Sequence, residues 1–419
     1  MVERNSPCYT KTGGSGFNCT VAFAAQDSPK VNWPLTLLLL LLLLALRPAV
    51  AQTGNGPSLV GSGSPLWSSD PYTRGGFDHL YNYEYAEAIH DFELAAQARP
   101  SDPFAMNHLL TAVLFRELNR MGALDTEMYA TDAFLGTKLL PVDPQARDRV
   151  MALATRARLL TNDLLAANPN NVDALYAIGV TQSLQAIYLG LVDKAWFGAL
   201  RSALNARRDH ERVLQHAPQY TDAKLVVGIH EYVAGSLSWW AKTGMFVFGV
   251  HGNKSRGIED LYVAANGGGE TAVNARVALS LFLRREHKYA EALSLVRILI
   301  RSYPRNFLFA LEEAKLLNEL GQRQEATAAY RKLLVDDPAR VYPNARPELT
   351  WYGLGETLQA QHEYGEAEAA YRRVLEYPQA SPNLRRRASV RVSQMRAQSG
   401  QKQEGSTQIP PSISAAGPI

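Results

Sequence analysis

The chain has 419 residues, with 43 lysines and arginines against 40 aspartates and glutamates, and a formal net charge of +3 at pH 7. This length exceeds one ordinary globular core, so it predicts several domains or one extended array. The near balance of charges excludes a protein that attracts nucleic acid through its overall charge.

Residues 1–51 have the pattern of a leader with a secretory signal. The leucine run at 37–44 is followed by Ala49, Val50 and Ala51, which fits the small-x-small rule for cleavage after Ala51. A spanning helix needs roughly 20 apolar residues, which this run lacks, although an uncleaved anchor stays open as an alternative. The sequence therefore predicts an exported protein of the periplasm or cell envelope, or a secreted one.

Cleavage at this point would change the chemistry of the chain. Both cysteines, Cys8 and Cys19, lie in the leader, so the mature protein would have no disulfide and no thiol nucleophile. The next segment, residues 52–70, is rich in glycine and serine, which predicts a flexible linker.

Residues 71–381 contain a repeated pattern. The segments 85–100, 289–304, 323–338 and 364–378 each have Glu-Ala, a large residue four positions on, an apolar residue three positions later, and a closing proline. From Ala292 to Ala326 the step is 34 residues. No single unit of this kind can bury its apolar face alone, so neighbouring units are expected to stack.

This step and pattern resemble the tetratricopeptide repeat, in which each unit is a pair of antiparallel helices. The resemblance implies an all-α fold, a right-handed superhelical solenoid of about seven helix pairs. Small residues are expected where the two helices of a unit cross closely, with a large side chain beside them. The last unit has the most complete match, at Trp351, Leu354, Gly355, Leu358, Ala367 and Tyr371.

Units two to four do not keep the regular spacing. The sequence predicts long insertions between their first and second helices, at 123–145, 186–203 and 236–254. The same loop of successive units emerges on one edge of a solenoid, so the three insertions are expected to lie together.

Aromatic residues are concentrated in these insertions. We expect them to line a cleft for a partner or small ligand, to pack the insertions onto the solenoid, or to make a peripheral contact with a membrane surface. The candidates are Tyr188, Trp196, Phe197, Trp239, Trp240, Phe246 and Phe248.

The resemblance also implies a second candidate surface, because first helices line the concave groove of tetratricopeptide proteins. Basic residues there would suit acidic groups or a C-terminal carboxylate of a peptide. The alternative is that these are ordinary solvated side chains. The groove candidates are Arg284, Arg285, Lys315, Asn318, Tyr352 and Glu356.

Residues for catalysis or for a cofactor are not apparent. His210 and His216 are six positions apart, which points them to different faces of a helix and gives no metal spacing. The segment 249–257 lacks the glycine that a phosphate-binding loop has before its lysine. Residues 266–270, "NGGGE", indicate a helix end and a tight turn. We expect no enzyme activity, no metal and no cofactor.

The chain is expected to end in a helix over 382–398, whose Leu384, Ala388 and Met395 cap the last unit, followed by a disordered tail at 399–419. The leading hypothesis is an exported, monomeric scaffold that binds a protein or peptide through its groove or its aromatic edge. The alternative is a carrier that holds an apolar small molecule or lipid between the insertions of units two to four.

Overall fold

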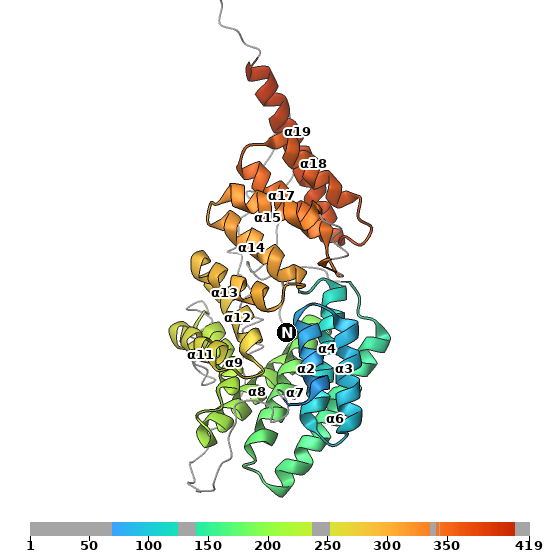
Figure 1. The fold of residues 1–419 in the computed structure, drawn as a ribbon, viewed down its shortest axis with the longest axis vertical. Coiled ribbons are helices and arrows are strands. Elements are labelled where there is room, and N and C mark those ends of the chain that lie inside the picture. Colours follow the sequence, from blue (N-terminus) through green and yellow to red (C-terminus); the bar gives the residue numbers. More distant parts are fainter. Residues whose placement is uncertain (1–68, 125–139, 237–251, 336–340, 343, 407–419) are drawn as a thin grey trace, which may run out of the picture. The chain divides into compact units, whose positions relative to one another are not determined.

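The computed structural model describes residues 69–124, 140–236, 252–335, 341–342 and 344–406, and every regular element within these ranges is a helix (Figure 1). The predicted all-α class is therefore confirmed. In chain order the elements are α2 (Pro71–Tyr81), α3 (Tyr85–Ala98), α4 (Pro103–Met121), α6 (Pro144–Ala167), α7 (Val172–Leu191), α8 (Trp196–His216), the short 3₁₀ helix η2 (Thr221–Ala223), α9 (Lys224–Gly235), α11 (Lys254–Asn266), α12 (Ala272–Arg285), α13 (Tyr289–Ser302), α14 (Phe307–Glu319), α15 (Arg323–Val335), α17 (Pro347–Ala360), α18 (Tyr364–Leu375) and α19 (Pro382–Ser406).

The helices pack in chain order, each against the helices just before and just after it. This arrangement agrees with a repeated helix pair as the building unit. The number of repeat units and the handedness of the superhelix stay predictions. The pairs are α2 with α3, α4 with α6, α7 with α8, α9 with α11, α12 with α13, α14 with α15, and α17 with α18.

Close crossings within the pairs explain the repeated small residues. A Cβ atom on Gly355 would lie 2.8 Å from the ring of Tyr371, and one on Gly76 would lie 2.5 Å from the ring of Phe92. Ala367, on the second helix of the last pair, is fully buried. A larger side chain at these points would push the two helices apart, so the repeat needs a small residue facing a large one.

Three helices begin at an Asp-Pro pair, at 70–71, 102–103 and 143–144. In each case the aspartate side chain accepts a hydrogen bond from a backbone N–H of the first turn. Proline follows where its missing N–H is not needed and its φ already suits a helix. Local sequence therefore fixes where these helices start.

The prediction of a long insertion between the two helices of unit three is wrong. Residues 186–203 instead extend α7 and α8, which are joined only by residues 192–195. The apolar residues of this segment have helical spacing, and Tyr188, Ala199 and Leu200 are buried. Burying that face is possible when both helices lengthen.

The insertions predicted in units two and four fall largely at 125–139 and 237–251, outside the described residues. The same holds for their aromatic candidates Trp239, Trp240, Phe246 and Phe248. The leader 1–51 and most of the linker 52–70 also lie outside them. These expectations stay predictions.

The C-terminal helix α19 begins at the predicted position and continues to Ser406, past the expected end at 398. Leu384, Ala388 and Met395 are buried, and α19 packs against α18. It therefore covers the last helix pair.

Within the described ranges, α7 is the one helix that is long and apolar enough to cross a membrane. However, 56% of its most apolar window is buried inside the fold, and the helix lies against α4, α6 and α8. The burial of α7 is that of a helix in the core of the fold.

Candidate partner-binding surfaces

Arg284, the central residue of the predicted positive groove, is buried at the junction of α12 and α14. Its side chain is 4% exposed. Its Nη1 lies 3.3 Å from a carboxylate oxygen of Glu312, and its Nε donates to Glu319 at 2.9 Å. Because these two carboxylates neutralise the guanidinium, Arg284 joins neighbouring units and does not offer a free charge to a ligand.

The remaining groove candidates are partly covered. Arg285, Lys315 and Asn318 are half-buried. Tyr352 is buried, and the guanidinium of Arg387 from α19 lies 4.6 Å from the centre of its ring. Burial, the main cause, raises the pKa of Tyr352.

The last groove candidate, Glu356, also meets α19. Its carboxylate lies 3.7 Å from Arg387. The chain's own last helix therefore occupies the surface that Tyr352 and Glu356 were expected to present.

Of the aromatic-edge candidates, Tyr188 is part of the core. It is 1% exposed, and its hydroxyl donates to Asp193 at 3.3 Å. Burial raises its pKa to about 12. The cavity beside it measures about 30 Å³, which is room for about one water molecule and too little for a lipid.

Trp196 and Phe197 begin α8 and differ from each other. The ammonium of Lys194 lies 5.6 Å from the ring centre of the half-buried Trp196. Phe197 is 81% exposed. It is the candidate aromatic that the described part of the chain presents to solvent.

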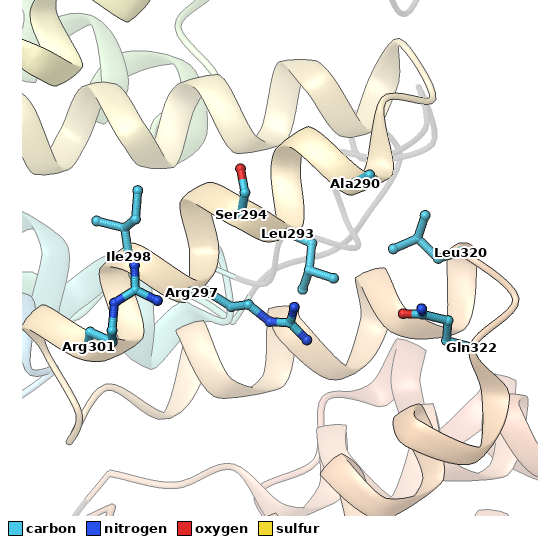
Figure 2. A pocket seen from close by; sticks show the side chains of 8 residues that line it. All are labelled: Ala290, Leu293, Ser294, Arg297, Ile298, Arg301, Leu320 and Gln322. Atoms are coloured by element: carbon cyan, nitrogen blue, oxygen red, sulfur yellow. The ribbon is translucent and has the colours of Figure 1, made fainter.

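A hollow of about 500 Å³ lies on the outer side of α13. Figure 2 shows its wall of residues along α13, with Leu320 and Gln322 from the turn before α15 facing Leu293. Ile298 is 36% exposed there. The hollow is lined by Ala290, Leu293, Ser294, Arg297, Ile298, Arg301, Leu320 and Gln322.

The α13 sequence places these side chains on one stripe. Positions 290, 294, 297, 298 and 301 recur at the three- and four-residue steps of a single helix face. The opposite face holds the buried Ala292, Leu295, Val296 and Leu299. Sequence reasoning missed this surface. The available signal was an isoleucine between two arginines on the otherwise polar stripe.

The two arginines of the stripe differ. Arg297 donates from Nε to Glu313 of α14 at 2.8 Å, so one carboxylate is already beside it. Arg301 has an exposed side chain and no ion-pair partner among the residues that the structure describes. The hollow therefore combines apolar surface with one cation that a ligand can meet.

A second hollow, of about 590 Å³, lies on α11 and includes Ile258, Tyr262 and Val263. The hydroxyl of Tyr262 donates to Glu291 of α13 at 3.1 Å. This hydrogen bond places the outer faces of α11 and α13 next to each other.

Buried polar residues join units two to five. Thr271 donates from its hydroxyl to Asp222 at 2.6 Å, and burial raises the pKa of Asp222. Glu270 lies 3.1 Å from His108 Nε2 and accepts from the hydroxyl of Tyr176 at 3.3 Å. These contacts cross from α4 and α7 to the turn before α12, so they hold the units together.

This cluster also explains the "NGGGE" segment at 266–270. A Cβ atom on Gly269 would lie 2.2 Å from the carboxylate of Asp222, so the turn must lack a side chain there. Among the described residues, no group of three His, Cys, Asp or Glu side chains could hold a metal ion.

We find no protein-family model that matches this chain and no curated protein whose sequence matches it. Among solved structures, the chain is similar to a tetratricopeptide repeat protein from Parabacteroides merdae, at 14% identity and a TM-score of 0.33, over 76% of this chain and 97% of that one. It is similar to the APC/C hetero-tetramer Cut9–Hcn1 at 14% identity and a TM-score of 0.44, over 80% of this chain and 51%, about half, of that one. It is similar to yeast Tom70 at 12% identity and a TM-score of 0.38, over 83% and 68% of the two chains.

The assignment of the repeat therefore depends on this chain's own residues. Its helices pair in chain order, its units keep a 34-residue step where they are regular, and its glycines face aromatic rings at the crossings. The described part of the chain is an array of helix pairs stacked in chain order, and its repeat pattern resembles that of tetratricopeptide proteins.

Proposed function

We propose that the protein is a monomeric, non-enzymatic scaffold that binds a segment of a protein partner in the outer hollow on α13. The observation that supports this proposal is the exposed Ile298 between two arginines above a hollow of about 500 Å³. A partner segment that fits has an aliphatic side chain for the hollow and a carboxylate for Arg301.

The expected strength follows from the two kinds of contact. Covering an aliphatic side chain contributes about 1.5–3 kcal/mol, and a two-pronged arginine–carboxylate pair adds direction as well as energy. Because Arg297 already has Glu313 beside it, Arg301 is the arginine whose charge the partner complements.

We expect selection of random displayed peptides against the full chain to enrich aliphatic residues flanked by aspartate or glutamate. Ile298→Asp or Arg301→Glu should weaken binding of the enriched peptides about tenfold or more, since each change removes roughly 1.4 kcal/mol or more of contact energy. Fluorescence anisotropy measures this change.

The chain offers a matched control for this experiment. Leu159 and Arg158 are an exposed aliphatic residue and an exposed arginine on α6, another second helix. The variants Leu159→Asp and Arg158→Glu should leave binding unchanged. Peptides that bind all four variants equally would contradict the proposal.

We also propose that the scaffold works after export, in the periplasm or cell envelope. The leucine run at 37–44 and the sequence Ala49-Val50-Ala51 support this. Protein recovered from envelope fractions should begin at Gln52 when its N-terminus is sequenced. A cytoplasmic protein that retains residues 37–51 would contradict export.

A further inference from the structure

The turn between α2 and α3 is held by residues 189 to 261 positions later in the chain. The side-chain amide of Asn306 donates to the backbone carbonyl of Tyr81 at 2.7 Å. The side-chain amide of Asn344 donates to the backbone carbonyl of Tyr83, also at 2.7 Å. Two asparagines thus bind two main-chain oxygens of one short segment.

Arg305 binds the acidic end of the same turn. Its Nε and Nη2 donate to the two carboxylate oxygens of Glu84 at 2.6 and 3.0 Å. Its backbone N–H donates to Asn82 Oδ1 at 3.1 Å, and its Nη2 donates to Asp78 at 3.2 Å. The hydrogen bonds from Arg305 lower the pKa of Glu84, so the carboxylate is bound in its charged form.

Tyr81 supplies the aromatic contact of the turn. Its ring centre lies 5.2 Å from that of Tyr303. Its hydroxyl accepts from the side-chain amide of Asn274 at 3.2 Å and donates to the carbonyl of Glu270 at 3.1 Å. Tyr81 is 7% exposed, so the surrounding residues enclose its tyrosine ring.

The residues that contact the turn at 81–84 bind groups that many peptides contain. They lie on α12, in the turn between α13 and α14, at the start of α14, and just before α17. They bind two backbone carbonyls, a carboxylate and a tyrosine ring. In repeat arrays most contacts join neighbouring units, whereas these join the first helix pair to the fifth and later pairs.

We propose that these residues form a peptide-binding site that the turn at 81–84 occupies within the same molecule. The external ligand that fits is a partner segment with a tyrosine followed by a glutamate three positions on. This partner segment binds when the turn at 81–84 leaves the site. The site is separate from the hollow on α13.

The turn at 81–84 and an external peptide compete for the same site, and the turn has the advantage. A ligand tethered to its own receptor acts at a local concentration of the order of millimolar, so the turn excludes a free peptide of similar affinity. Weakening the turn should therefore expose the site, whereas weakening Arg305 should remove it.

The probe is a fluorescent peptide with the sequence of residues 76–88, and the protein is the full chain. The variant Glu84→Gln should bind the peptide about tenfold or more tightly than the wild type. Adding Arg305→Glu to this variant should abolish binding, and a peptide with lysine in place of the glutamate should restore it.

Two controls separate this result from general loosening of the fold. Glu366→Gln removes an exposed partner of Arg331, whose Nη2 lies 2.8 Å away, and should leave peptide binding at the wild-type level. Ile298→Asp should leave it unchanged too, so this proposal and the one for the α13 hollow can fail independently. Equal peptide binding by wild type, Glu84→Gln and the double variant, or no binding by any of them, would overturn the proposal.

Discussion

Replacing Gly257 with alanine should lower the free energy of unfolding by about 2–3 kcal/mol, within the range for overpacking a close contact. A Cβ atom at Gly257 would lie 2.4 Å from the backbone nitrogen of Tyr232 and 2.7 Å from the backbone oxygen of Gly228. Because both are backbone atoms of α9, neither can rotate away, and α11 must move as a whole. Chemical denaturation followed by far-ultraviolet circular dichroism measures the loss.

Gly365→Ala is the matched comparison. Gly365 lies on α18 and is exposed, and an added Cβ would meet no atom of the described structure within 4 Å. Alanine has the higher helix propensity, so this variant should be equally stable or more stable, by up to about 1 kcal/mol. If the two variants lost the same stability, the close crossing of α9 and α11 would be disproved.

Replacing Arg284 with methionine should cost about 3 kcal/mol or more, because it breaks the buried ion pair between Arg284 and Glu312 by removing one partner. Glu319 loses its hydrogen bond from Nε as well. Adding Glu312→Gln should recover part of the loss, since the amide removes the buried charge. Thermal unfolding of the single and double variants measures both effects.

The exposed pair of Arg331 and Glu366 provides the control for this series. Both side chains are more than half exposed, and such pairs contribute roughly 0–1 kcal/mol. Arg331→Met should therefore change stability little. If Arg284→Met were equally mild, the ion pairs of Arg284 with Glu312 and Glu319 would contribute no more than an exposed pair, which would contradict the role of Arg284 in joining neighbouring units.

The repeat could be predicted because its causes are local. Gly355, Ala367 and Tyr371 lie within one helix pair, and their spacing alone predicts that a small residue faces a large one. The predicted start of α19 at 382 and its buried Leu384 are local in the same way.

Other features depend on the neighbouring unit. Arg284 and Glu319 are 35 positions apart, about one repeat step, so they meet only after two units have stacked. A small rotation of a first helix about its axis moves an arginine from the groove to the contact between two units. The sequence does not determine this rotation. The segment at 186–203 was equally ambiguous, because an apolar run with helical spacing suits a longer helix as well as an inserted one.

The two proposed sites were even harder to predict from the sequence. Ile298 on an exposed stripe is common in helical proteins. The contacts of the turn at 81–84 join positions 189 to 261 residues apart, and no periodic pattern relates such positions.

Those long separations also affect how the protein is made. Ribosomes add roughly 5–20 residues per second, so Arg305 is synthesised on the order of 10–45 s after Glu84. Until then the first helix pair lacks the side chains that hold its turn, although it leaves the ribosome before all other pairs. The first helix pair is therefore completed only after the first five pairs have been synthesised. A nascent chain released before Arg305 would display the tyrosine and carboxylate of that turn to chaperones and proteases.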